Sequence, residues 1–208
     1  MLATLDQPQE VRQDSRHDAR QRLLDAAMEA FREQGYRASI DLIAARAHVA
    51  RQTVYNHFGS KDGLFAEVVR QASQSILVAL DTEGDLRETL IAFGQAFREK
   101  LLNPDGIAMF RTMVAEAPNF PELSRQFFQV GPVSTRKRLA NYLEQAMKSG
   151  LLRKEDPDIA AEMLANMLVD YERLKALLTL TPTSINPQKT AQVVDYFLRL
   201  FATEKEIS

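Results

Sequence analysis

The stretch SIDLIAARAHVARQTVYNHFGSK, residues 39–61, decides the fold of the first part of this chain. Its first half repeats apolar side chains at helical spacing, and several of these are alanines small enough to let two helices cross closely. Its second half places Val54 and Phe58 on one side of a helix and polar residues on the other. The pattern therefore predicts two short helices, 40–47 and 51–58, joined by a tight turn.

The polar side of the second helix carries groups that can read DNA. Gln52 and Asn56 can hydrogen-bond bidentately to adenine in the major groove, and Thr53 can touch a thymine methyl. Arg51 and Lys61 can neutralise backbone phosphates. Few catalytic sites need this mixture on one helical face. The alternative is an ordinary helical hairpin with a solvated polar face, which helical periodicity taken alone would favour.

The neighbouring sequence favours the DNA-binding interpretation. Upstream, LLDAAMEAFREQGY (23–36) carries an apolar stripe that ends at Gly35, a residue typical of a helix C-terminus. Downstream, Ser60 can cap the next helix. With LLDAA, FREQGY, IAARA, TVYNHFGSK and a final LF in family order, the run 23–65 resembles the DNA-binding domain of the TetR/AcrR family of transcriptional regulators.

That resemblance implies roles for individual residues. The helix 51–58 would be the recognition helix of a helix-turn-helix domain, with three side chains on phosphates and three on or near bases. The implied phosphate contacts are Tyr55, His57 and Lys61, and the implied base contacts are Gln52, Thr53 and Asn56. We add Arg51 and Ser39 to complete the predicted DNA-binding set.

Two positions depart from the family pattern. The family usually carries a Thr-Ser or Thr-Thr pair before the first helix of the motif, whereas here Ser39 alone must serve as the N-cap. The family favours glycine in the turn, where φ is often positive, but this chain has His48. We expect His48 to be a strained turn residue or a further phosphate contact. His17 lies near Asp14 and Asp18, but a solvated helix entrance is expected there, so no metal site is predicted.

Composition narrows the class of protein. Of 208 residues 45% are hydrophobic, enough for a true core, and the absence of cysteine excludes disulfides and thiolate metal sites. Residues 11–63 carry 9 basic and 7 acidic side chains, a net charge of +2, whereas residues 64–208 carry 17 and 19, a net charge of −2. A protein that coats DNA nonspecifically would be more basic, so tight binding should depend on specific placement and on two copies acting together.

Helix start signals recur along the rest of the chain, and no stretch shows sustained strand alternation. The signals are Asn103-Pro104, Asp156-Pro157 and Asn186-Pro187, with capping boxes at Asp85-x-x-Glu88 and Asn119-x-x-Glu122. Gly150 is typical of a helix C-terminus. The chain is therefore predicted to be all-α. The expected helices are 16–34, 40–47, 51–58, 61–80, 85–102, 104–116, 120–129, 132–149, 157–179 and 187–203.

We expect three parts along the chain. Residues 1–15 would form a flexible N-terminal arm, 16–63 the helix-turn-helix DNA-binding domain, and 64–208 a larger helical ligand-sensing and dimerisation domain. Arms of this kind sometimes reach the minor groove in family members, which makes Arg12 and Arg16 candidates, with a disordered leader as the alternative.

The last two predicted helices each keep an apolar stripe, too apolar for a free surface. They would pack either within the monomer or, as such helices usually do in this family, against their twins in a homodimer. We favour the dimer, because two recognition helices must be held about 34–36 Å apart to enter successive major grooves. The predicted interface residues are Met163, Leu164, Met167, Leu168, Tyr171, Val194, Phe197, Leu198 and Phe201.

The middle helices carry adaptable apolar side chains that could line a pocket for a hydrophobic or amphipathic small molecule, although a plain core is the alternative for each. The candidate pocket residues are Phe93, Phe97, Met109, Phe110, Met113, Phe127, Tyr142, Met167 and Tyr171, with Arg111, Glu116 or Tyr142 as polar anchors. Residues 109–132 and 139–168 resemble the C-terminal domain of AefR-like members of the family, a resemblance that names no ligand.

An enzyme on a helical scaffold is the rival from another class. The sequence contains no glycine-rich phosphate loop, no His-Glu-x-x-His and no cysteine nucleophile, so no catalytic residue and no cofactor is predicted. A closer rival is a DNA-binding regulator of the same fold without a small-molecule inducer, controlled by a protein partner or by abundance. The start lacks the features of a signal peptide and no apolar run is long enough for a membrane span, so we expect a soluble, cytoplasmic protein.

Overall fold

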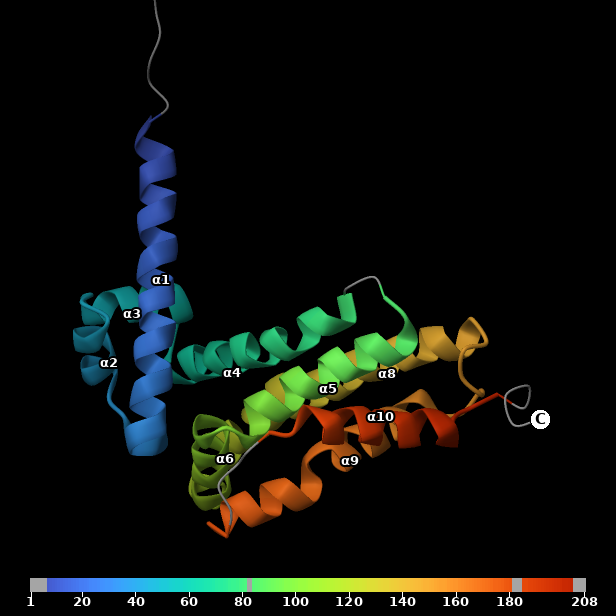
Figure 1. Cartoon of the computed structure of the whole chain (residues 1–208). Helices are drawn as coiled ribbons and strands as arrows, with labels where there is room; N and C mark the ends of the chain where they lie inside the picture. Colours follow the sequence, from blue (N-terminus) through green and yellow to red (C-terminus); the bar gives the residue numbers. More distant parts are fainter. Residues whose placement is uncertain (1–6, 82–83, 181–184, 204–208) are drawn as a thin grey trace, which may run out of the picture. The chain divides into compact units, whose positions relative to one another are not determined.

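The computed structural model describes residues 7–81, 84–180 and 185–203, with side chains from residue 18 onward except that of residue 170. Within these residues the chain forms ten α-helices joined by short connections and contains no strand (Figure 1). The predicted all-α fold is therefore confirmed. The chain divides into two compact units, the first ending at Val68 and the second beginning at Val69. This division lies inside helix α4 (Lys61–Leu77), a few residues beyond the predicted domain boundary.

The first unit contains three helices before α4. They are α1 (Gln7–Gln34), α2 (Ile40–Arg46) and α3 (Arg51–Phe58), with a 3-10 turn, η1 (Gly35–Arg37), after α1. Helix α2 packs against both α1 and α3. At the centre, the ring of Phe31 lies 5.2 Å from that of Phe65 and 6.1 Å from that of Tyr36, all three side chains being buried. This aromatic cluster holds the first helix against the start of α4.

Helix α1 begins nine residues earlier than predicted, because residues 7–15, expected to belong to a flexible arm, are helical (Figure 1). Pro8 lies in the first turn, where a missing backbone N–H costs no intrahelical hydrogen bond, so it does not stop the helix. The DNA contacts predicted for Arg12 and Arg16, and the group around His17, involve side chains that the structure does not describe. Residues 1–6 also lie outside the described residues.

Local signals in the helix-turn-helix stretch act as predicted. The Ser39 hydroxyl accepts a hydrogen bond from the backbone N–H of Leu42 at 3.1 Å, so one serine is enough to cap α2. His48 adopts a φ of +53°, the left-handed conformation expected of the residue in the glycine position. The Ser60 hydroxyl caps α4 by accepting from the N–H of Gly63 at 3.0 Å.

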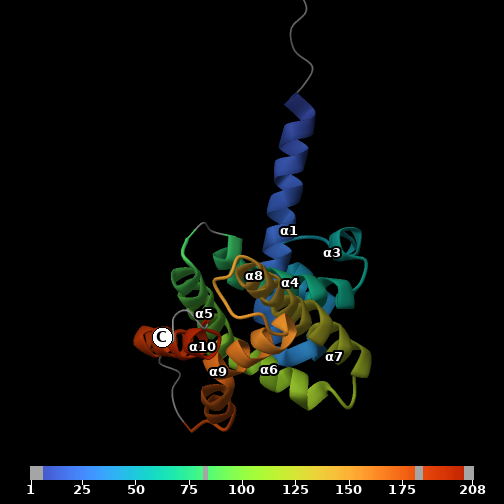
Figure 2. The same ribbon diagram turned by 90° about the vertical axis from the view of Figure 1, so that its right-hand side faces the viewer.

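The second unit is a helical layer around one core. After the 3-10 turn η2 (Val78–Asp81), its elements are α5 (Leu86–Leu102), α6 (Pro104–Glu116), α7 (Pro121–Phe128), the π-turn η3 (Gln129–Val133), α8 (Ser134–Lys148), α9 (Pro157–Leu177) and α10 (Pro187–Leu200). Helix α9 packs against α8, α5 and α10, and α10 also packs against α5. Within this unit α7 and α10 lie on opposite sides (Figure 2).

Four of the five predicted caps in the second unit are confirmed. The side chains of Asp85, Asn103, Asp156 and Asn186 each accept a backbone N–H at the start of α5, α6, α9 and α10. The capping box predicted at Asn119 and Glu122 is wrong. The N-cap of α7 is Phe120, whose own N–H donates to the carbonyl of Glu116 at 2.8 Å. The turn after α6 is therefore tighter than predicted, and Asn119 lies one residue before the N-cap position.

The predicted break between helices near residue 130 is also wrong. Helices α7 and α8 run into one another through the π-turn Gln129–Val133, although this turn contains both Gly131 and Pro132. A proline inside a regular α-helix clashes with the carbonyl four residues before it, and the wider π-turn relieves that clash. Gly131 is buried, and a Cβ atom at this position would meet the side chain of Val69 at 3.1 Å.

Candidate nucleic-acid interface and regulatory unit

Helix α3 has one buried and one exposed side, as its sequence predicts. Val54 is fully buried and fastens the helix to the first unit. Arg51, Gln52 and Asn56 are exposed, whereas Thr53 is half-buried. The amide Nε2 of Gln52 donates to Oδ1 of Asn56 at 3.1 Å, a hydrogen bond that uses neither the carbonyl oxygen of Gln52 nor the amino group of Asn56.

Arg51 is held at the start of α3 by two neighbours. Its Nη1 lies 3.2 and 3.1 Å from the two carboxylate oxygens of Asp41 on α2, and its Nη2 donates to the hydroxyl of Tyr55 at 3.2 Å. The guanidinium carbon lies 5.7 Å from the centre of the Tyr55 ring. Sequence reasoning did not find Asp41, although its negative charge within the motif was a usable signal.

Lys61 has partners of its own. Its ammonium group donates to the backbone carbonyl of Tyr36 and lies 4.3 Å from the centre of the Tyr36 ring. The hydroxyl of Tyr36 in turn donates to the carboxylate of Asp62. Burial lowers the pKa of Lys61. One of its three N–H donors is thus committed to the protein, and the others remain for a phosphate.

The predicted DNA-binding residues are therefore only partly brought together. Arg51 with Tyr55, and Gln52 with Asn56, form contacting pairs along α3. The half-buried ring of His57 lies 5.9 Å from the Phe58 ring on the same helix. Ser39, at the other end of the motif, serves as a helix cap.

The predicted dimer-interface set needs correction. Five of its members, buried in the core of the second unit, have no surface to offer a partner: Leu164, Leu168, Val194, Phe197 and Phe201. The prediction chose the wrong side of each helix, because α9 and α10 direct these side chains into the core shared with α5 and α8. The exposed apolar side chains of α9, its C-cap Leu178 and α10 are Ile159, Met163, Tyr171, Leu174, Leu178, Tyr196 and Leu200. Met163 and Tyr171 belong to both sets, while Met167 and Leu198 are half-buried.

The predicted pocket residues fall into three groups. Phe93, Phe97 and Met113 are buried, and the first two rings stack with centres 5.5 Å apart. Met109, Phe110, Phe127, Tyr142 and Met167 are half-buried. Tyr171 is 68% exposed on α9, so its assignment to an internal pocket is wrong.

Arg111 is not a pocket anchor in this structure. Its Nη2 donates to the carbonyls of Ala176 and Leu177, at 3.2 and 3.0 Å. These carbonyls belong to the last turn of α9, and that of Ala176 also accepts from the backbone N–H of Thr179 at 3.1 Å. Arg111 therefore caps the C-terminus of α9, and the pocket role predicted for it is withdrawn.

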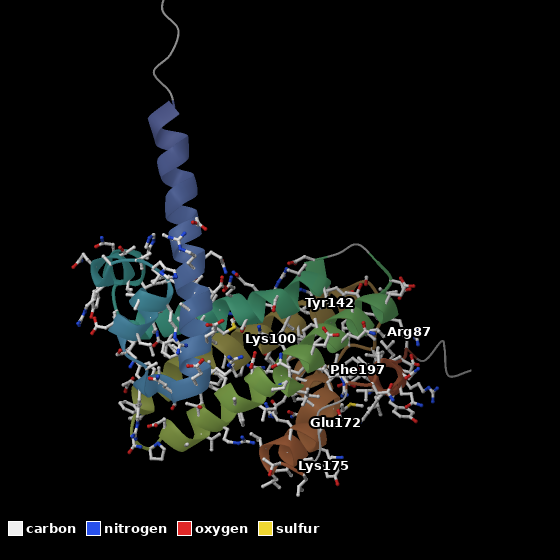
Figure 3. All side chains as sticks on the ribbon, turned by 60° about the vertical axis from the view of Figure 1, so that its left-hand side comes forward. Arg87, Lys100, Tyr142, Glu172, Lys175 and Phe197 are labelled. Atoms are coloured by element: carbon white, nitrogen blue, oxygen red, sulfur yellow. The ribbon has the colours of Figure 1, made fainter. Side chains whose placement is uncertain are left out.

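A buried charge that sequence reasoning missed lies between α5, α9 and α10. Arg98 is fully buried, and its Nη1 donates to the carbonyl of Leu168. Its Nη2 lies 2.6 Å from a carboxylate oxygen of Glu172, whose other oxygen accepts from Lys189 at 2.7 Å (Glu172 is labelled in Figure 3). Burial opposes ionisation of Glu172, but the hydrogen bond from Lys189 and the charge of Arg98 lower its pKa overall. Position 98 continues the apolar series Leu90, Phe93 and Phe97, a signal that it faces inward.

The first unit of this all-α chain is a helix-turn-helix, the fold of a large class of DNA-binding proteins. Residues 23–68 match the model of the bacterial regulatory proteins of the TetR family, and residues 88–204 match that of the AefR-like transcriptional repressor C-terminal domain. The chain belongs to the TetR family, with a C-terminal domain of the AefR-like type. Its family and relatives are regulators, not enzymes.

Relatives and solved structures agree with this assignment. The HTH-type transcriptional regulator YvkB of Bacillus subtilis is 27% identical over 160 residues, which cover 72% of this chain and 79% of YvkB. A solved structure from Mesorhizobium loti, classed with TetR-family transcriptional regulators, is 26% identical with a TM-score of 0.74 and covers 90% of this chain and 98% of its own. The flavonoid-responsive regulator FrrA is 28% identical with a TM-score of 0.68, covering 89% and 98%.

Two further observations concern the described residues alone. No helix among them combines the length and the apolar character needed to cross a membrane. Nowhere in the same part of the chain do three His, Asp or Glu side chains converge as a metal ion would require.

Proposed function

We propose that this protein is a homodimeric transcriptional repressor that binds a palindromic operator and is released from it by a hydrophobic small molecule. The observation that carries the DNA-binding part is the exposed Gln52–Asn56 pair on α3, whose amides are ordered by the 3.1 Å hydrogen bond between them. The acceptor and the donor that this bond leaves unused match the N6 and N7 edge of adenine. The repressor role is supported by the AefR-like repressor domain over residues 88–204.

Dimerisation is supported by the exposed apolar stripe of α9. Tyr171, Leu174 and Leu178 follow one another at helical spacing with 68%, 52% and 57% exposure, a row of large apolar groups that a second copy would remove from water. The proposed interface therefore contains these residues with Met163 of α9 and Tyr196 of α10. It replaces the buried leucines and phenylalanines of the original prediction.

Release by a small molecule is supported by the half-buried methionines and aromatic side chains of α6 to α9, which are adaptable enough to repack around a ligand. The similar protein FrrA is named for its response to flavonoids, planar amphipathic compounds of the class we propose here. A coupling free energy of about 1–3 kcal/mol would lower DNA affinity about 5- to 150-fold. Helix α4, which begins in the first unit and ends in the second, is the element through which we expect the coupling to act.

Selection of bound fragments from sheared genomic DNA of the source organism, followed by sequencing, tests the proposal. A shared palindromic site supports a dimeric sequence-specific regulator. Retention of only random fragments contradicts it. Addition of apolar small molecules to the selected duplex then tests release. If none shifts the melting temperature or the affinity, control by a protein partner or by abundance replaces the ligand.

Substitutions on α3 should divide into two classes. Gln52→Ala and Asn56→Ala should change base preference, each lowering discrimination at one or two base pairs by about 5- to 150-fold, since a bidentate base contact is lost. Tyr55→Phe and Lys61→Ala should both weaken operator binding, and loss of the Lys61 charge should weaken binding to all sequences alike and reduce the salt slope by about one. Binding titrations on a set of single-pair operator variants distinguish the two patterns.

Asn141→Ala is the matched control for Asn56→Ala, because Asn141 is an exposed asparagine on α8. It should leave both affinity and base preference unchanged. Unaltered binding by all four α3 and α4 variants would contradict the assignment of this surface to DNA.

Charge placed on the exposed side of α9 should separate the subunits. The variant Tyr171→Glu with Leu174→Glu would bury two carboxylates in the proposed interface, so we expect monomers in sedimentation velocity at micromolar concentration. Binding to the full palindrome should fall at least tenfold, whereas binding to a single half-site should not change. Arg125→Glu, on α7 at the opposite side of this unit from α10 (Figure 2), is the control and should remain dimeric. A dimeric double variant would place the interface elsewhere.

A further inference from the structure

Arg51 is restrained in a way that its neighbours on α3 are not. It is the first residue of α3, and its guanidinium is held from one side by both oxygens of Asp41 and from another by the hydroxyl of Tyr55. Asp41 belongs to α2 and Tyr55 to the next turn of α3. The guanidinium group is thus fixed relative to both helices of the motif.

Stability does not explain this arrangement. The side chains of Arg51 and Asp41 are 59% and 65% exposed, and ion pairs in such surroundings contribute little to the free energy of unfolding. What the two contacts do change is the freedom of the arginine, a side chain with many rotamers that would otherwise have to be ordered on binding. The contacts preorganise Arg51 for a ligand.

The hydrogen bonds to Asp41 and Tyr55 leave part of the guanidinium available. The group has five N–H donors, and the contacts described above use Nη1 and Nη2. Within the described part of the chain no acceptor approaches Nε. Nε and Nη2 are the two donor atoms on one edge of the guanidinium, the edge that can match O6 and N7 of guanine.

The charge of Asp41 selects among possible acceptors. A DNA phosphate bound to Arg51 would be brought close to the carboxylate of Asp41, and the two negative charges would repel each other. The edge of a base carries no net charge and meets no such penalty. The N-terminal residues of a recognition helix are also those that contact base edges in helix-turn-helix complexes.

We propose that Arg51 reads a guanine in the major groove, and that Asp41 and Tyr55 are the positioning residues that aim its guanidinium. This inference rests on the proposed function and replaces the phosphate contact predicted for Arg51. The Tyr55 hydroxyl can serve both roles, since it accepts from Arg51 while its own hydrogen stays available for a phosphate. The operator should therefore contain a guanine beside the base pairs read by Gln52 and Asn56.

The test uses the full-length protein and the duplex obtained by fragment selection, with every base pair replaced in turn. The wild-type protein should prefer one G·C pair in each half-site by about 5- to 150-fold. Arg51→Ala should abolish that preference and leave the others. Asp41→Asn, which keeps size and removes charge, should reduce the same preference while binding to unrelated DNA becomes tighter. Asp25→Asn on α1, the same change at another exposed position, should alter no base preference.

The contrary outcomes are distinct. If Arg51→Ala weakens binding equally on all duplexes and lowers the salt slope by about one, Arg51 contacts a phosphate and the inference is wrong. If Asp41→Asn tightens binding on every duplex without changing the preference, the positioning role is wrong. A wild-type protein that selects no shared site overturns the proposed function as well, whereas a selected site without a preferred G·C pair overturns this inference alone. Circular dichroism of each variant verifies that it is folded.

Discussion

Replacing Arg98 with alanine should lower the free energy of unfolding of the second unit by about 3–5 kcal/mol. Arg98 is fully buried, and its guanidinium joins the carbonyl of Leu168 to the carboxylate of Glu172. Removing it leaves these acceptors without their donor and opens a cavity between α5, α9 and α10. Denaturant unfolding monitored by circular dichroism, with hydrogen exchange resolved by segment, measures the loss and locates it.

Arg125→Ala is the matched control, since the side chains of Arg125 and Glu122 form an ion pair that is 65% and 81% exposed. It should leave unfolding nearly unchanged, because water solvates both charges when the pair is broken. The variant with Arg98→Met and Glu172→Met should recover much of the stability lost in Arg98→Ala, since no buried charge is left unpaired and Lys189, which loses Glu172, is 44% exposed and can be solvated. A loss below about 1 kcal/mol for Arg98→Ala would contradict the structural role given to this arginine.

Replacing Phe31 with alanine should abolish DNA binding, although Phe31 has no exposed surface. The lost burial and the resulting cavity cost about 3–5 kcal/mol for a phenylalanine in a core. A unit of this size is stable by about 3–10 kcal/mol, so the change removes a large part or all of its stability. The ring contacts with Tyr36 and Phe65 are lost with it, and these hold α1 against the start of α4. Hydrogen exchange should rise throughout residues 23–68.

The exposed residue Glu29, two positions earlier on α1, supplies the control, and Glu29→Gln should retain both folding and DNA binding. The second unit should keep its protection from exchange in the Phe31→Ala variant, because its core is separate. Full DNA affinity in Phe31→Ala, or protection lost equally across both units, would show that the aromatic cluster does not have the role inferred here.

Local signals in the sequence predicted the helices well. The caps at Ser39, Asp85 and Asn103 each act over three residues, and the sequence predicts each from the side chain that accepts a free backbone N–H. The helix-turn-helix was predictable for the same reason, because its apolar and small residues recur at fixed spacing in one short stretch. The π-turn was not, since glycine followed by proline usually ends a helix, and the packing of Gly131 against Val69 is a tertiary contact.

Which side of a helix faces the core was harder to predict when both sides are apolar. On α9 one side carries Leu164 and Leu168 and another carries Met163 and Tyr171. Hydropathy alone does not indicate which of these two sides packs against the core. The same limit applies to Arg98, whose charge argues for the surface although its position in the repeat argues for the core. The contacts of Arg51 with Asp41 were missed because the two residues lie ten positions apart, on different helices.

The sequence by itself determined the all-α fold, the helix-turn-helix and the polar face of α3, because each depends on periodicity, capping and turn conformation within a few residues. Tertiary structure alone decided which apolar stripe of α9 is buried, that Arg98 lies in the core, and that Asp41 holds Arg51. These outcomes depend on side chains that are distant in the chain and meet only when the helices pack. The free energy of such contacts cannot be inferred from the sequence of a single helix.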